Sequence, residues 1–210
     1  PPHNQDRMEP QGPFQSPHPP GGNMFTDFAK PYIGIIDNGA LYRKPFVILY
    51  TALAALNLLS ILGVLGFMFK GGIALIITGL FMIFALWIGF QLWWDRRTKV
   101  NSFATPGSEF VALPVFSHLV QTMGEWTGTF VAIAGTGASL GGLIGSIGSG
   151  GGGGYGNPLA QFSNLGFAGL IACPIVGFLI LILSRAIAEQ IRALVAVANN
   201  TRNIERNTAR

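Results

Sequence analysis

A stripe of polar side chains in an otherwise apolar region has a spacing that could support chemistry. Its members are His118, Thr122, Glu125, Thr129, Thr136 and Ser139, with Ala132 completing the alternating intervals of four and three residues. On a helix these positions share one face. An ionisable side chain inside a membrane span is costly and is by default a functional hypothesis. The stripe therefore predicts an ion path, with Glu125 as the proton or cation site, His118 as a relay and the hydroxyl groups as the polar lining.

Two other interpretations of the same stripe remain open. If the membrane begins at Trp126, Glu125 lies at the interface beside an aromatic anchor, and His118 lies on the wet side of a surface helix. The hydroxyl groups would then bond to backbone carbonyl groups one turn back in their own helix. The stripe could instead hold a neighbouring subunit.

No other arrangement of residues points to catalysis. The three histidines are scattered and Cys173 is the single cysteine, so neither a metal-ligand spacing nor an intrachain disulfide is present. The five consecutive glycines at 150–154 follow no strand and precede no lysine, unlike a phosphate-binding loop. The sequence predicts a protein that is not an enzyme and that holds no metal or cofactor.

The distribution of charge indicates which elements carry the polar stripe. Charged residues make up 10% of the 210 residues, against about a quarter in a soluble domain. Residues 45–69, 71–94 and 126–184 contain no Asp, Glu, Lys or Arg. A spanning helix needs about 20 apolar residues, so the first two stretches hold one span each and the third is long enough for two. The sequence therefore predicts an all-α membrane protein with four transmembrane helices arranged as two helical hairpins.

The boundaries of the segments in this arrangement follow from composition and from the Pro, Gly and charged residues that separate the apolar stretches. They are a disordered Pro-rich leader (1–23), an interfacial amphipathic segment (24–44), a transmembrane hairpin (45–94), a loop (95–113), a second hairpin (114–184) with a Gly-rich loop (148–156), and an amphipathic helix with a tail (185–210). Pro45 suits the first position of the first spanning helix, because the missing N–H costs nothing there. The polar residues 199–210 are expected to fray.

Small and apolar residues in the last span predict helix contacts. Gly169, Cys173 and Gly177 recur every fourth residue, a pattern that lets helices approach closely in lipid. Beyond the span, Ile187, Ile191 and Leu194 continue at helical spacing. This second set is interpreted either as a short coiled-coil seam or as a face packed on the chain's own helices, since two heptads do not distinguish them.

Basic residues predict the orientation in the membrane. Twelve of the thirteen Lys and Arg residues lie on one side of a four-span arrangement, and Lys70 lies on the other. The positive-inside rule then places both termini in the cytoplasm. This bias accounts for the net charge of +4 without nucleic acid, and the basic residues beside lipid could bind anionic headgroups.

Three features of the chain occur together: the leader residues Phe25-Thr26-Asp27-Phe28, the tight first hairpin, and the Arg/Glu/Ile tail at 185–191. In this layout the chain resembles small uncharacterised bacterial inner-membrane proteins. The resemblance implies a multi-pass protein of the bacterial inner membrane. It implies no activity, because such families have none assigned. The hydroxyl-bearing residues Thr129 and Thr136 also suggest an analogy to ion-driven stator proteins.

Two functions are expected from these features. The first is a structural or accessory subunit that assembles through small-residue helix contacts, with copies of itself or with other membrane subunits. The alternative is a proton- or cation-conducting unit that uses the stripe around Glu125.

Overall fold

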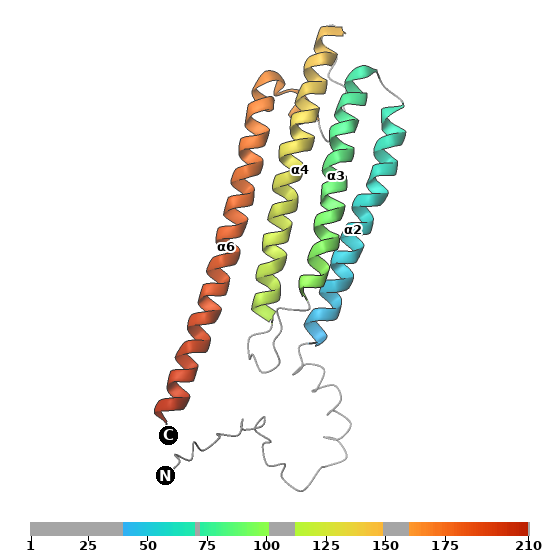
Figure 1. Cartoon of the computed structure of the whole chain (residues 1–210). Helices are drawn as coiled ribbons and strands as arrows, with labels where there is room; N and C mark the ends of the chain where they lie inside the picture. The colour runs from blue at the N-terminus through green and yellow to red at the C-terminus, as the bar shows by residue number, and fades with distance from the viewer. Residues whose placement is uncertain (1–39, 70–71, 101–111, 149–159, 210) are drawn as a thin grey trace, which may run out of the picture.

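The computed structural model describes residues 40–69, 72–100, 112–148 and 160–209, and these residues are helical apart from short connections (Figure 1). The elements are α2 (Ala40–Met68), α3 (Ile73–Val100), α4 (Ala112–Gly148), the short α5 (Ala160–Ser163) and α6 (Gly166–Thr208). Three predicted segments lie wholly or largely outside the described residues. They are the leader (1–23), nearly all of the interfacial segment (24–44) and most of the Gly-rich loop (148–156).

Four helices are long and apolar enough to cross a membrane, as the sequence predicts. The candidate spans are Lys44–Met68, Ile73–Val100, Ala112–Ile147 and Gly166–Thr208. Only 17% to 33% of the most apolar part of each span is buried inside the protein. Side chains of this composition would be insoluble if water covered them, so lipid must cover them. The chain is therefore an integral, multi-pass membrane protein.

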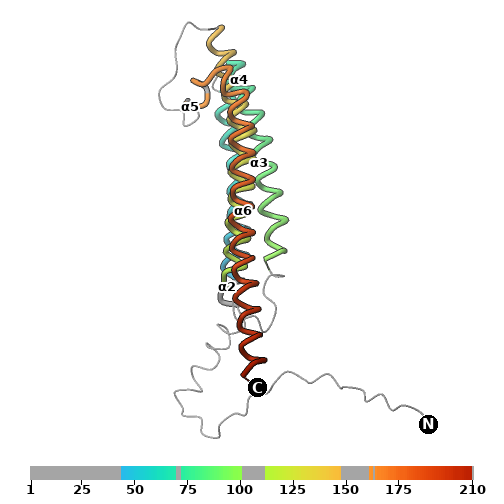
Figure 2. Tube along the Cα trace, turned by 90° about the vertical axis from the view of Figure 1, so that its left-hand side faces the viewer, coloured from blue at the N-terminus to red at the C-terminus, as the bar shows by residue number. Residues whose placement is uncertain are grey.

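The spanning helices form a row one helix thick, in the order α6, α4, α3, α2 (Figure 1). Seen from the side, α6, α4 and α2 overlap in a narrow column, with the lower part of α3 displaced from it (Figure 2). Among the described residues, α6 contacts α4 and α5, and its backbone does not come near α2 or α3. The two edges of the row are therefore α6 and α2; α6 packs on α4 alone among the spanning helices, whereas α2 packs on α3 and also makes a small contact with α4.

Glycines set the close approach of α4 and α6. A Cβ atom added at Gly177 would lie 2.4 Å from the carbonyl oxygen of Gly128, and one added at Gly128 would lie 2.5 Å from that of Gly177. Near the far end of α6, a Cβ at Gly169 would lie 2.0 Å from Oγ of Ser139. Backbone packed this tightly maximises dispersion contacts, which drive helix association where lipid removes the hydrophobic effect.

The other two helix pairs also place small residues at the contact. A Cβ at Gly137 of α4 would lie 2.2 Å from Cβ of Phe81 in α3. Thr78 of α3 donates a hydrogen bond to the carbonyl of Gly137 at 3.3 Å as well as to its own helix. Between α2 and α3, a Cβ at Gly79 would overlap the side chain of Met68. Each neighbouring pair in the row is thus closely packed.

Two helices are much longer than the bilayer requires. With a rise of 1.5 Å per residue, α4 is about 55 Å long and α6 about 65 Å, against a hydrocarbon core of about 30 Å. Charged residues restrict the apolar part of α6 to residues up to Ser184 and that of α4 to residues from Trp126. The remaining parts of both helices, the first residues of α4 and the last of α6, lie toward the same end of the row, where α6 alone continues well past the other helices (Figure 1).

Three boundaries differ from the prediction. Helix α2 begins at Ala40 and contains Pro45, because a proline near a helix start removes one backbone hydrogen bond without ending the helix. The loop expected at 95–113 is shorter, since α3 continues to Val100 and α4 begins at Ala112. Residues 199–208, which the sequence predicts to fray, form the last turns of α6 in the structure.

Candidate functional site: a charged cluster at one end of the row

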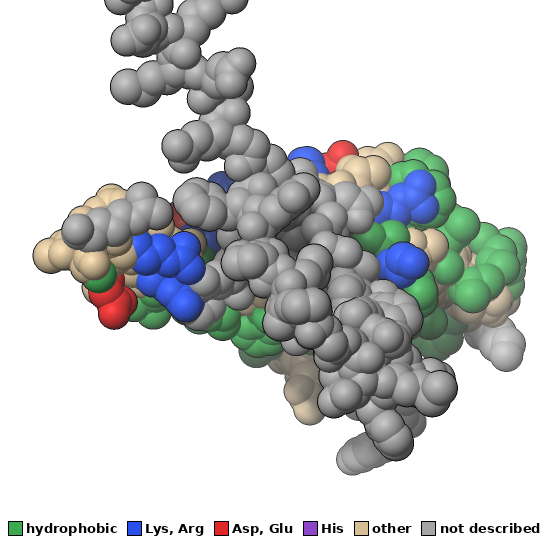
Figure 3. All heavy atoms as spheres, turned by 90° about the horizontal axis from the view of Figure 1, so that it is seen from below, with side chains coloured by type: hydrophobic (Ala, Val, Ile, Leu, Met, Phe, Trp, Pro, Cys, Tyr) green, Lys and Arg blue, Asp and Glu red, His purple; other side chains and the backbone are tan. Residues whose placement is uncertain are grey.

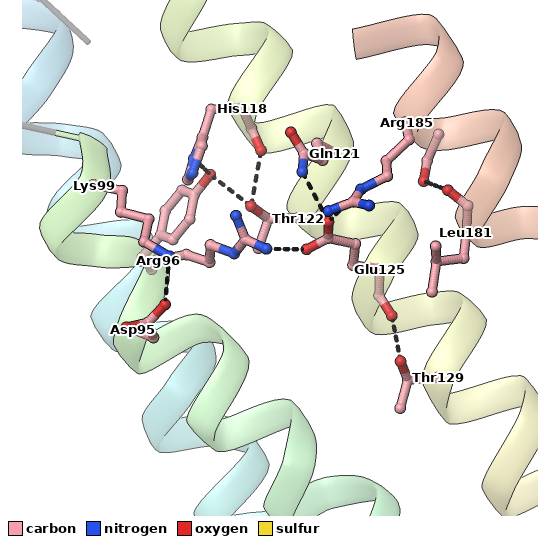
Figure 4. A network of polar contacts seen from close by, with 12 residues as sticks. Asp95, Arg96, Lys99, His118, Gln121, Thr122, Glu125, Thr129, Leu181 and Arg185 are labelled. Carbon is pink, nitrogen blue, oxygen red and sulfur yellow. Dashed lines mark hydrogen bonds and ion pairs between the residues drawn. The ribbon is translucent and has the colours of Figure 1, made fainter. Parts of the chain in front are cut away.

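Glu125 of α4 binds groups from the helices on both of its sides (Figure 4). One carboxylate oxygen accepts from Nη2 of Arg96 in α3 at 2.7 Å. The other accepts from Nε of Arg185 in α6 at 3.2 Å and from the amide of Gln121 at 2.8 Å. Glu125 is 6% exposed. One buried carboxylate therefore joins three helices, including α3 and α6, which have no backbone contact with each other.

The cluster continues along the α4–α6 contact. The guanidinium group of Arg192 donates through Nη2 to the side-chain oxygen of Gln121, and through Nε to the hydroxyl of Ser117 at 3.3 Å. Ser117 is fully buried. Arg185 and Arg192 lie seven residues apart, so they project from the same side of α6 toward α4.

A second polar group joins α2 to α4 at the same level. The hydroxyl of Tyr50 lies 2.9 Å from Nδ1 of His118 and 3.5 Å from the hydroxyl of Thr122. All three residues are buried, and the Tyr50 ring packs edge-on against Trp93 with centroids 5.1 Å apart. His118 therefore lies in the core between helices. Its placement on the wet side of a surface helix, one of the alternatives above, is wrong because α4 is a single continuous helix packed on both sides.

The hydroxyl groups of the polar stripe mostly bond to their own helix. Thr122, Thr129, Thr136 and Ser139 each donate to the backbone carbonyl four residues earlier, at distances from 2.5 to 2.9 Å. Ser139 also contacts the carbonyl of Phe162 at 2.9 Å. A hydroxyl bonded in this way has its proton committed to its own helix, while its oxygen keeps lone pairs that can accept a further bond.

Charge at this end of the row is predominantly positive. Seen from below, Lys and Arg side chains gather around the end of the row where α4 begins and α6 ends (Figure 3). Arg97 stacks on Trp94, with its guanidinium carbon 3.3 Å from the ring centroid. Lys99 pairs with Asp95 at 2.9 Å on the exposed surface of α3. Aromatic and basic side chains at one level are typical of the interface between lipid and water.

Sequence reasoning found part of this cluster. The structure brings His118, Thr122 and Glu125 together at the charged end, while Thr129, Thr136 and Ser139 extend away from it along α4. The partners Arg96, Arg185 and Tyr50 were missed, as were Gln121 and Arg192. One signal was available: Arg96 and Arg185 are among the first charged residues after their spans, so an antiparallel arrangement puts them level with Glu125.

The predicted helix-contact residues divide into two groups. Gly169, Cys173 and Gly177 are buried, with Cys173 and Gly177 against Gly135 and Gly128 of α4, so this stripe packs within the chain. Ile187 and Leu194 point away from the bundle and are exposed, and Ile191 is half-buried beside them. The residues of α6 that face α4 beyond the membrane are Ser184, Ala188 and Val195.

No group of three or more His, Cys, Asp or Glu residues within the described part of the chain could hold a metal ion. Comparisons with protein-family models, with curated proteins and with solved structures find no match to this chain.

Proposed function

We propose that the chain is a structural or accessory subunit of an oligomeric or multi-protein complex in the bacterial inner membrane. The observation that carries this proposal is the row of helices, in which α6 has α4 as its one spanning neighbour among the described residues and α2 forms the other edge (Figures 1 and 2). Such a row leaves most of its apolar surface uncovered, since only 17% to 33% of the most apolar part of each span is buried. It is suited to lying between, or against, other membrane helices.

The charged cluster supports a structural role for Glu125. Both of its oxygens accept hydrogen bonds from cationic or amide groups, and two arginines compensate its charge. A proton or cation site needs a carboxylate that can exchange its ligand. The alternative function, conduction of protons or cations along the stripe, is therefore less well supported than the structural one, and Thr129 and Thr136 bonded to their own backbone do not strengthen it.

The proposed orientation has both termini in the cytoplasm. The start of α2 and the end of α6 lie at the same end of the row, the end where the described basic side chains gather (Figures 1 and 3). Retention of basic residues on the cytoplasmic side is the main determinant of topology. The same residues provide contacts for anionic lipid headgroups.

Native mass spectrometry of the protein, extracted gently from its own membrane, tests the proposed function. We expect a mass larger than one chain, from copies of the chain or from other proteins. A single chain carrying only lipid would refute the proposal. Glu125→Gln tests the alternative: if the mutant assembles normally but loses a proton-dependent flux into vesicles, conduction replaces the structural role.

The orientation has a separate test. A cysteine placed at Thr208, near the end of α6, in a chain whose native Cys173 is replaced by Ala, is treated in intact cells with a membrane-impermeant maleimide. We expect labelling only after the membrane is opened. Labelling in intact cells would reverse the proposed topology.

A further inference from the structure

The part of α6 beyond the membrane has an exposed apolar face that nothing among the described residues covers. Its residues are Ile187, Gln190, Leu194, Val197, Thr201 and Ile204, and they are called the α6 seam below. The exposed fractions of Ile187, Leu194, Val197 and Ile204 are 53%, 70%, 61% and 66%. The opposite side of the helix carries Ala188, Arg192 and Val195, which pack on α4 or bond to it.

Lipid does not reach most of this seam. The membrane part of α6 ends near Ser184, where Arg185 meets Glu125. Leu194 lies about 15 Å further along the helix axis, beyond a headgroup layer that is about 5–7 Å thick. Water would therefore cover three large apolar side chains, Leu194, Val197 and Ile204, on a single helix.

The spacing of the seam is that of a helix–helix contact. Its residues follow intervals of 3, 4, 3, 4 and 3, and Leu183 extends the pattern into the membrane by four more residues. This is the a/d repeat that packs knobs into holes in a coiled coil. The charged residues of this segment all lie off the seam, and they are Glu189, Arg192, Arg202, Glu205 and Arg206.

The final turns of α6 also need support. Residues 196–208 are all exposed except for the half-buried Asn199. They include several poor helix formers, namely Asn199, Asn200, Thr201, Asn203, Asn207 and Thr208. A single helix of such residues is marginal in water, because most helix stability in proteins comes from packing. The regular helix to Thr208 thus indicates a packing partner.

We infer that this partner is the α6 of a second copy of the chain, lying parallel to the first. The inference rests on the proposed function and names one partner for it. Copies in one membrane share one orientation, so a two-fold axis along the membrane normal places each seam residue opposite itself. Because the α6 seam carries no charged residue, it can pack against the α6 seam of the second copy without repulsion between like charges.

The polar positions of the seam fit an identical partner well. Gln190 would meet Gln190 of the second copy, and a side-chain amide can donate and accept at once, so the pair satisfies itself. Thr201 would pair with its image in the same way. Polar residues at a/d positions set register and strand number in coiled coils. The seam covers fewer than three heptads, but anchoring in one membrane raises the effective concentration of the partner.

Disulfide cross-linking in native membranes tests this inference. Cys173, the single cysteine, is replaced by Ala, and one cysteine is introduced at Leu194 or Val197 of the seam, or at the exposed off-seam position Ala196 or Glu189. The seam residues are exposed, so these substitutions leave the fold of one chain intact. We expect a disulfide-linked dimer to be the main oxidised product of Leu194→Cys and Val197→Cys. We expect no such dimer from the off-seam variants Ala196→Cys and Glu189→Cys.

A charge substitution provides the second readout. Leu194→Glu would place two carboxylates opposite each other, so we expect the cross-link at Val197→Cys to be lost, while Ala196→Glu leaves it unchanged. Equal cross-linking at seam and off-seam positions would overturn the inference. So would adducts with other proteins and no homodimer, although the proposed function would then stand. A single chain in native mass spectrometry would overturn both.

Discussion

Removal of the carboxylate at Glu125 should destabilise the row more than any other single change at its charged end. Glu125→Ala leaves Arg96 without its 2.7 Å partner, and the Arg96 side chain is only 20% exposed. Breaking a buried ion pair by deleting one partner costs about 3–5 kcal/mol. The other arginine, Arg185, is 54% exposed and can turn to solvent or lipid phosphate. We therefore expect a loss near the lower limit, about 3 kcal/mol in the free energy of unfolding.

Equilibrium unfolding in mixed micelles with increasing SDS measures this loss, followed by the fluorescence of the buried Trp93 and its neighbour Trp126. The matched control is Lys99→Ala, which breaks the exposed pair with Asp95 at the same end of α3. It should leave the unfolding midpoint unchanged, because exposed pairs contribute little.

Within the cluster the order of effects is also expected to follow burial. Arg96→Ala should cost more than Arg185→Ala, for which we expect about 1 kcal/mol or less because its side chain is half exposed. If Glu125→Ala proves no more destabilising than Lys99→Ala, the carboxylate does not hold the three helices together. The structural interpretation of the cluster would then be refuted.

Two further predictions concern contacts between neighbouring helices. Gly177→Ala should lower the free energy of unfolding by about 1–3 kcal/mol, because the added methyl group forces α6 away from the carbonyl of Gly128. The control is Gly66→Ala, where nothing lies within 4 Å of the added Cβ and no loss is expected. The same SDS titration compares the two variants. Equal effects would mean that the α4–α6 contact is not sterically limited. Tyr50→Phe should cost about 1–2 kcal/mol, since it removes the hydroxyl that lies 2.9 Å from His118 in a buried site. An unchanged midpoint in that variant would show that the hydrogen bond between α2 and α4 contributes no net stability.

The sequence alone determined the number of spans. Uncharged stretches as long as a bilayer admit one interpretation, because every buried backbone group in lipid must be satisfied within a helix. Small residues at intervals of four marked the face of α6 that meets another helix, since only glycine and small side chains permit that approach. These are local properties, visible in one segment at a time.

The sequence could not reveal which helices are neighbours. Two helical hairpins can pack as a bundle of four or as a single row, with the same lengths and the same apolar composition. The row follows from the particular fit of α4 between α3 and α6, where Gly137 receives Phe81 and Gly128 meets Gly177. Such complementarity depends on pairs of residues far apart in the chain.

The same limit explains what was missed around Glu125. Its spacing placed it on a polar face with His118 and Thr122, and the period of the helix suffices for that. Its partners Arg96 and Arg185 come from two other helices, and their contact depends on where each helix stands along the membrane normal. The sequence alone also could not show which residues of α6 form its exposed seam. The packing of Ala188 and Val195 on α4 decides which face of α6 stays exposed. Periodicity determines the faces of each helix, and tertiary packing decides what each face meets.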